Sequence, residues 1–185
     1  MFGLDRKKIF LIIIVIIIVV VLIFSIWIVA AYNGLVSKKT NAEAQWAQVE
    51  NQIQRKIDLI PQIAAAVGNF TASEIQFQKD ITDLRTQWLN ATDLRDRINL
   101  SGQIDNYITV ASINENYPNL ASAILTEENI DIIEGTENRI AVERGRYNTA
   151  VQAYNTQVRS FPDNIVAGWF GFNELEYYDP IPGGP

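Results

Sequence analysis

The 185-residue sequence contains no histidine and no cysteine. Without histidine the chain has no imidazole to act as a general base or to bind a metal ion. Without cysteine it has no disulfide, thiolate nucleophile, zinc–thiolate site, iron–sulfur cluster or acylated cysteine anchor. Gly-x-Ser-x-Gly, Walker and glycine-rich dinucleotide motifs are also absent from the sequence. We therefore predict that the protein is not an enzyme and binds no cofactor or metal.

Positive charge is scarce as well, with 15 Lys and Arg against 21 Asp and Glu and a net charge of −6. The charge is unevenly distributed along the chain. Residues 1–8 carry three basic and one acidic side chain, whereas residues 32–185 carry 12 basic and 20 acidic ones, a net charge of −8. Because no basic stripe is present, we predict no nucleic-acid partner.

One apolar run stands out against this composition. Residues 9–31 contain no charge and only one polar side chain, Ser25. At ~1.5 Å per residue they would form ~35 Å of helix, enough to cross a hydrocarbon core of ~30 Å. The run is too long for the apolar part of a typical signal peptide. We therefore predict a single-pass transmembrane helix over 9–31 in the cell membrane, preceded by a basic N-terminal segment over 1–8, with the lipid bilayer as a partner.

Basic and aromatic residues flank this predicted span, as is typical of side chains at a membrane–water boundary. The expected anchors are Arg6, Lys7, Lys8, Trp27 and Tyr32. Three basic side chains precede the span, and Lys38 and Lys39 follow it. This excess predicts a cytoplasmic N-terminus and an extracytoplasmic location for the bulk of the chain.

Beyond residue 40 the apolar residues recur every three or four positions, which indicates helices. The most regular stretch runs from Thr126 to Phe161 in alternating steps of four and three and is typical of a coiled-coil seam. Polar or proline-containing breaks near 69–73, 90–93 and 116–119 separate four helical segments. We predict an all-α fold in which an antiparallel four-helix bundle over 32–162 follows the transmembrane helix. Pro61 is expected to bend the first bundle helix.

The sequence contains several short blocks in a recognisable order and spacing. These blocks are Tyr32-Asn33-x-Leu35-Val36, Trp46, Arg55-Lys56-x-Asp58-Leu59-Ile60-Pro61, Tyr117-Pro118-x-Leu120, Glu137-Asn138-Arg139-Ile140-Ala141, Arg144-x-Arg146-Tyr147-Asn148, Tyr154-Asn155 and Phe161-Pro162-x-Asn164. Together they resemble the LemA family. The resemblance covers roughly residues 28–178. It implies a single-pass membrane protein with an elongated helical-bundle domain and no established enzymatic activity.

The same resemblance implies a role in membranes or the cell envelope. Some relatives are linked to envelope maintenance beside a membrane metalloprotease, and one branch resembles proteins that help to shape magnetosome membranes. The usual description of the family places the short N-terminus outside, opposite to the charge excess. Both orientations therefore stay open.

Two seam positions of the last helix are charged rather than apolar, Glu137 and Arg144. We predict a polar seam network in which Arg55 and Asp58 face them. Such a network is either a docking point for a partner or a structural device that fixes the register of the helices, and the second interpretation is favoured. Tyr-Asn pairs begin at residues 32, 147 and 154, and we expect them to supply packing rings and hydrogen bonds between helices.

The segment over 163–178 is unusually rich in aromatic and apolar residues. Its candidate interaction residues are Ile165, Trp169, Phe170, Phe172, Tyr177 and Tyr178. Either it forms a short helix that caps the bundle or folds back on it, or it is an exposed patch that contacts another copy, a partner or lipid. Residues 179–185 are expected to form a flexible tail.

These predictions combine into one functional hypothesis. The chain is a non-enzymatic, membrane-anchored helical scaffold of the cell envelope that forms homo-oligomers and organises the membrane or envelope. The alternative is an adaptor or regulatory partner of a membrane protease in envelope quality control.

Overall fold

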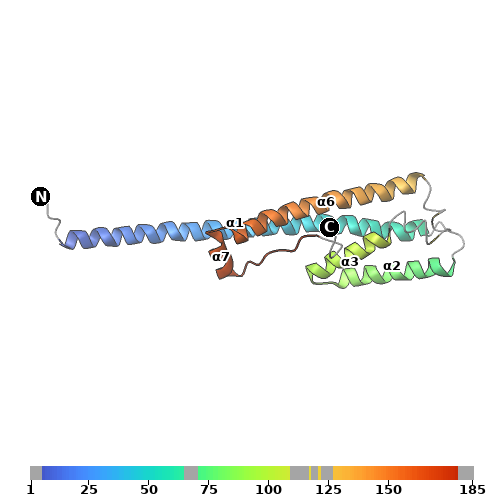
Figure 1. Ribbon diagram of the computed structural model, residues 1–185, viewed down its shortest axis with the longest axis horizontal. Coiled ribbons are helices and arrows are strands. Elements are labelled where there is room, and N and C mark those ends of the chain that lie inside the picture. The colour runs from blue at the N-terminus through green and yellow to red at the C-terminus, as the bar shows by residue number, and fades with distance from the viewer. Residues whose placement is uncertain (1–5, 65–70, 109–116, 118–120, 122–126, 179–185) are drawn as a thin grey trace. The chain divides into compact units, whose positions relative to one another are not determined.

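The computed structural model describes residues 6–64, 71–108, 117, 121 and 127–178. Within these ranges the protein is helical and has no strand, which confirms the predicted all-α fold class. The helices are α1 (Arg6–Ala64), α2 (Ala72–Asn90), α3 (Leu94–Tyr107), α6 (Glu127–Arg159) and α7 (Asp163–Phe170) (Figure 1). The finer expectation of an antiparallel four-helix bundle stays a prediction. The predicted break at 116–119 and the predicted flexible tail lie largely or wholly outside the described residues.

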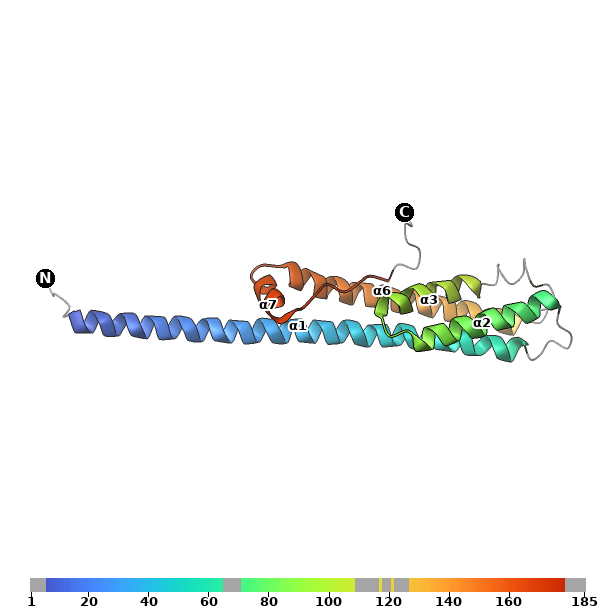
Figure 2. The ribbon, with the colours of Figure 1, turned by 90° about the horizontal axis from the view of Figure 1, so that it is seen from below.

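The chain divides into two compact units, which are described separately below. The first unit comprises residues 1–41 and 153–175, and the second comprises residues 42–152 and 176–185. Helix α1 contributes residues to both units, and so does α6. The same helices are seen from below in Figure 2.

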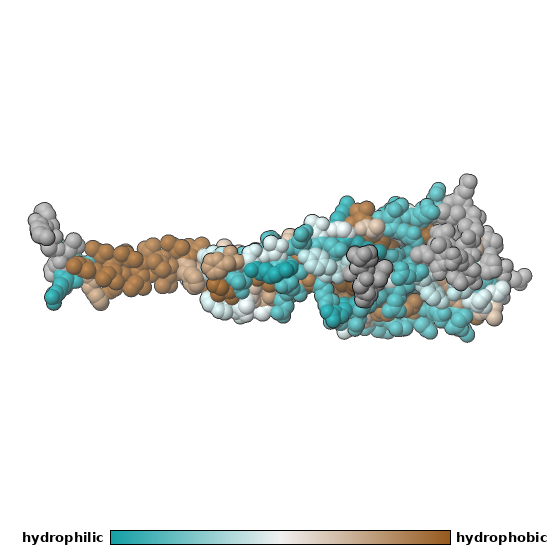
Figure 3. All heavy atoms as spheres, viewed as in Figure 1, coloured by the Kyte–Doolittle hydropathy of each residue, from teal (hydrophilic) through white to brown (hydrophobic). Residues whose placement is uncertain are grey.

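The first unit contains the predicted transmembrane segment. The large apolar side chains between Ile9 and Ile26 are 36 to 70 % exposed, and Figure 3 shows them as a continuous hydrophobic surface. This part of α1 is long and apolar enough to span a membrane. The helix continues without interruption through Asn33 and Gly34. A Cβ atom at Gly34 would lie only 2.8 Å from Nε2 of Gln157, so a larger residue there would require the Gln157 side chain to move.

A small apolar core holds the first unit together beside the end of the apolar run. Its buried members are Ala31, Leu35, Tyr154, Val166 and Ala167, and the partly buried residues Trp27, Ile28, Val158, Phe172 and Leu175 pack against them. These residues come from α1, α6, α7 and the extended segment after α7. The core therefore packs α7 against α1 at the end of the predicted span.

The core of the second unit consists largely of residues that the helical periodicity predicts. Buried positions include Trp46, Val49, Ile53 and Ile57 of α1, Phe77, Ile81 and Trp88 of α2, Ile98 and Ile104 of α3, and Ile133, Ile140 and Tyr147 of α6. The predicted seam of the last helix is wrong at its final position. Phe161 lies beyond the end of α6 and is 81 % exposed, because the helix stops at Arg159.

Side-chain caps define where the shorter helices begin. Thr71 and Glu74 form a capping box at α2, in which the Glu74 backbone N–H donates to Thr71 Oγ1 at 3.3 Å and the Thr71 N–H donates to Glu74 Oε2 at 2.8 Å. Asp93 accepts the Arg95 N–H at 2.8 Å at the start of α3. Helix α7 ends at Phe170 and is capped by Gly171, whose left-handed φ of 72° favours glycine because it has no Cβ atom.

The capping box yields a stability prediction. We expect Thr71→Ala to lower the free energy of unfolding by about 1 kcal/mol, because it leaves a backbone donor of α2 without its acceptor. Thr82→Ala is the matched control, since Thr82 is exposed and donates only to Gln78 of its own helix, at 2.7 Å. Urea unfolding of the detergent-solubilised chain, followed by circular dichroism, measures both. Equal losses in the two variants would contradict this assignment of the cap.

Candidate functional site

The residues after α7 form an extended segment over 172–178, which runs back along α6 (Figure 2). In the second unit, Tyr147 and Asn148 of α6 bind its backbone. The Tyr147 hydroxyl donates to the Glu176 carbonyl oxygen at 2.7 Å. Asn148 accepts the Tyr178 N–H at 2.7 Å and donates to the Tyr178 carbonyl oxygen at 3.2 Å.

The same pattern occurs one heptad later, in the first unit. The Tyr154 hydroxyl donates to the Asn173 carbonyl oxygen at 2.9 Å. Asn155 donates to the Leu175 carbonyl oxygen and accepts the Leu175 N–H, both at 2.8 Å. We call the four residues Tyr147, Asn148, Tyr154 and Asn155 the Tyr–Asn clamp.

The two halves of the Tyr–Asn clamp match because the two backbones advance by the same length. Seven helical residues rise about 10.5 Å, and three extended residues span about 10 Å. The clamp therefore binds extended backbone. The side chains of these two pairs bind this segment instead of forming the hydrogen bonds between helices that the sequence predicts. The third pair behaves differently. The Tyr32 ring lies 4.9 Å from the ring of Phe170 and 5.5 Å from that of Phe172, centroid to centroid.

A cluster of four charged side chains lies inside the second unit. Lys56 is 2 % exposed, and its ammonium lies 2.6 Å from Asp105 Oδ1 and 3.1 Å from Glu137 Oε1. Arg144 Nη2 lies 2.6 Å from the other oxygen of Asp105. Two positive and two negative charges thus balance one another across α1, α3 and α6.

The electrostatics of this cluster keep its central carboxylate ionised. Burial acts to raise the pKa of Asp105, but attraction and hydrogen bonds from Lys56 and Arg144 hold it below its usual value. The ring of Tyr178 lies 4.4 Å from the guanidinium carbon of Arg144, and its hydroxyl is 2.9 Å from Ser101 Oγ. Burial raises the pKa of Tyr178. The end of the extended segment therefore packs directly on the charged cluster.

The structure brings together two of the four residues proposed for the polar seam network. Glu137 and Arg144 belong to the cluster, whereas Arg55 is exposed. Asp58 faces Arg85 Nη2 at 2.9 Å on a part-exposed surface. Lys56 and Asp105 supply the facing charges instead. The spacing carries a signal for Lys56, since it follows the buried Ile53 by three positions and so lies on the same face of α1.

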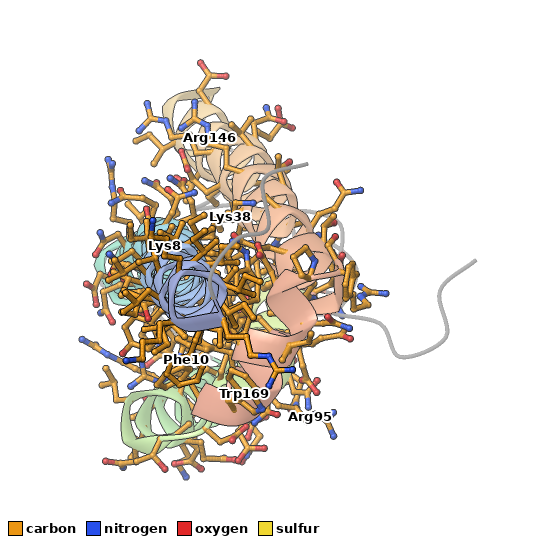
Figure 4. All side chains as sticks on the ribbon, turned by 90° about the vertical axis from the view of Figure 1, so that its left-hand side faces the viewer. Lys8, Phe10, Lys38, Arg95, Arg146 and Trp169 are labelled. Carbon is orange, nitrogen blue, oxygen red and sulfur yellow. The ribbon has the colours of Figure 1, made fainter. Side chains whose placement is uncertain are left out.

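The candidate interaction residues of the C-terminal segment divide by exposure. Ile165, Trp169, Phe170 and Tyr177 are exposed, Phe172 is half-buried, and Tyr178 is buried. Among the proposed membrane anchors, Arg6, Lys7 and Lys8 are exposed at the start of α1, Trp27 is half-buried, and Tyr32 is exposed. Figure 4 shows Lys8 and Phe10 pointing outward from α1.

Comparison with known protein families accounts for this combination of features. The sequence profile of the LemA family matches residues 45–182. The chain belongs to the LemA family. The match includes the charged cluster, the Tyr–Asn clamp and α7, and it begins after the predicted membrane span.

Individual relatives of this LemA-family chain carry magnetosome names. Magnetosome protein MamQ 1 and Magnetosome protein MamQ 2 of Paramagnetospirillum magneticum are each 23 % identical to it over 188 residues, which cover 87 % of this chain and 69 % of each relative. Magnetosome protein MamQ of Magnetospirillum gryphiswaldense is 22 % identical with the same coverage. Together with the apolar helix, these relatives support a location at a membrane.

The charged cluster predicts a pH-dependent stability. We expect Asp105→Asn to cost about 2–3 kcal/mol of unfolding free energy at pH 7, because it leaves Lys56 buried without its nearest carboxylate. The low folded pKa of Asp105 stabilises the wild type above the unfolded pKa of about 3.9, and this advantage is lost as the pH falls through the lower folded value. The difference in unfolding free energy between the wild type and Asp105→Asn should therefore become smaller below about pH 4.

The matched control for this prediction is Asp58→Asn, which removes a carboxylate from a part-exposed pair and should cost less than about 1 kcal/mol. Denaturant unfolding at several pH values measures all three proteins. A pH-independent difference between the wild type and Asp105→Asn would show that the cluster does not contribute through its ionised form.

The Tyr–Asn clamp predicts a change in protease sensitivity. We expect Asn148→Ala and Asn155→Ala to increase cleavage after Glu174 and Glu176 by a glutamate-specific protease, because the extended segment loses two backbone hydrogen bonds at each position. Thr149→Ala is the control, since the exposed Thr149 hydroxyl donates to Gly145 of its own helix. Cleavage at the wild-type rate in both asparagine variants would contradict the clamp.

Proposed function

We propose that this LemA-family protein is a non-enzymatic, membrane-anchored helical scaffold of the cell envelope. In this proposal α1 anchors the chain, copies of the chain associate with one another, and the assembly organises the surrounding membrane. The proposal rests mainly on one observation, the long apolar stretch of α1 with its side chains exposed. Its magnetosome relatives, named above, support a task connected with membranes.

The chemistry of the interior supports a structural role. The four charges of the cluster around the buried Lys56 pair with one another, which is the arrangement expected where polar groups fix the register of packed helices. The sequence has neither histidine nor cysteine for acid–base or thiol chemistry. These features favour a scaffold over an enzyme.

The outer surface of α6 supports association between copies. Ile132 and Val142 are apolar and exposed on this helix. A Cβ atom added at Gly135 or Gly145 would meet nothing within 4 Å, so the surface is open beside both glycines. Small and apolar residues on an exposed helix allow another long helix to approach closely.

The proposal predicts an oligomer. We expect the intact protein in mild detergent to have a mass of at least two chains by light scattering corrected for detergent. We further expect Val142→Glu to shift the mass toward the monomer, because it places a charge on the proposed contact. Leu89→Glu is the matched control, since Leu89 on α2 is 54 % exposed and Val142 is 52 % exposed.

A strictly monomeric wild-type protein would contradict the self-association part of this proposal. An envelope protease recovered in stoichiometric amounts with the monomer would instead favour the adaptor hypothesis. If the wild type is oligomeric and Val142→Glu leaves its mass unchanged, the α6 surface is not the contact.

A further inference from the structure

Helix α7 has two different faces. Val166 and Ala167 are buried in the core of the first unit. Ile165 and Trp169, four residues apart and therefore on one side of the helix, are exposed, and Trp169 is 62 % exposed. Phe170 at the end of the helix is also exposed. The outward face of this short helix is thus rich in large apolar side chains that the described residues cover only in part.

The buried face of α7 fixes its level along α1. Its core contacts include Trp27, Ile28 and Ala31, which are the last residues of the apolar run. The Phe170 ring contacts that of Tyr32, the first residue after the run, at 4.9 Å. Trp27 lies about 6 Å along the helix from Ala31. Helix α7 is therefore packed at the level where the predicted span ends.

We propose that α7 is a membrane-interface helix, which inserts Ile165, Trp169 and Phe170 among the lipids that surround the end of the span. The occupant of its outward face is the lipid bilayer that α1 crosses. The argument is continuity, because the apolar face of α7 adjoins the apolar surface of α1 within one compact unit. This inference rests on the membrane anchoring in the proposed function and is independent of self-association.

The chemistry of α7 specifies how it binds lipid. The helix carries no basic residue, and its one acidic side chain, Asp163, accepts a hydrogen bond from Gln157 at 2.8 Å. Attraction to anionic headgroups therefore contributes nothing on this helix, and apolar insertion provides the binding. Tryptophan suits this depth, because its ring is apolar and its N–H can reach water or headgroups.

Insertion of α7 gives the first unit a second contact with the bilayer. The single helix α1 alone would leave the unit free to tilt. A helix that inserts beside the end of the span resists tilting, because tilting would pull large apolar side chains out of lipid. In this proposal the first unit contacts the bilayer through the membrane-interface helix α7 as well as through the transmembrane helix α1.

The absence of native cysteine makes a direct test straightforward. Single-cysteine variants Ile165→Cys and Trp169→Cys of the full chain carry an environment-sensitive fluorophore and are reconstituted in phosphatidylcholine vesicles. The vesicles contain lipids with a doxyl quencher either high or low on the acyl chain. The control is Leu89→Cys, an exposed apolar position on α2.

We expect the labels at 165 and 169 to be quenched about threefold or more over the label at 89, and more strongly by the high quencher than by the low one. The quenching should not change between low and high salt, because no charge attraction contributes. Quenching at 165 and 169 no greater than at 89 would overturn the proposal. So would self-quenching between labelled copies without lipid quenching, which would assign this face to a second copy.

A measurement on the unaltered chain guards against disturbance by the labels. Photoreactive phosphatidylcholine is activated in vesicles that contain the native protein, and trypsin then releases the peptide 160–185, since no Lys or Arg follows Arg159. We expect lipid adducts on this peptide, and their absence would contradict the proposal. If adducts and quenching are present while the protein is monomeric in detergent, the interface helix stands and the self-association fails.

Discussion

The structure depends on how an extended segment without its own secondary structure satisfies its backbone. The hydrogen-bonding groups of residues 172–178 need partners when they lie against a helix. The Tyr–Asn clamp of α6 binds six of these groups, four carbonyl oxygens and the N–H groups of Leu175 and Tyr178. In each pair a tyrosine hydroxyl and an asparagine amide bind main-chain atoms. This binding therefore depends little on which side chains the segment carries. The Tyr–Asn clamp binds the residues that follow α7 in the sequence, and α6 ends just before α7 begins.

The clamp also links the segment to the charged interior of the second unit. By binding both backbone groups of Tyr178, Asn148 places the tyrosine ring over Arg144, and Arg144 in turn binds Asp105 beside Lys56. The buried ammonium of Lys56 tolerates little displacement from its carboxylate partners, because an unpaired ion in that position is costly. Tyr178 and the charged cluster therefore stabilise each other within the second unit.

The sequence predicts those features that arise from local periodicity. The uncharged run over 9–31, the helical class and buried seam positions such as Ile133, Ile140 and Tyr147 follow from residue type and spacing. The ion-pair partners of Lys56 cannot be predicted in this way, because Asp105 lies 49 positions and Glu137 lies 81 positions further along the chain. The role of Asn148 and Asn155 cannot be predicted from the sequence either. The spacing of an asparagine within a helix does not indicate that its hydrogen-bond partner is an extended backbone. The sequence also leaves open whether α7 is covered or exposed, because contacts with α1 bury Val166 and Ala167 and leave Ile165 and Trp169 outside.

Amide hydrogen exchange of the full chain in lipid vesicles tests the central claim most directly. The N–H group of Leu175 donates to Asn155, and that of Tyr178 donates to Asn148. If the clamp holds the extended segment, these two amide hydrogens exchange roughly 100-fold more slowly than those of a free chain, although neither residue lies in a helix. Exchange of both amides at the rate of a free chain would contradict the account, because the segment would then not be held against α6 and would not position α7.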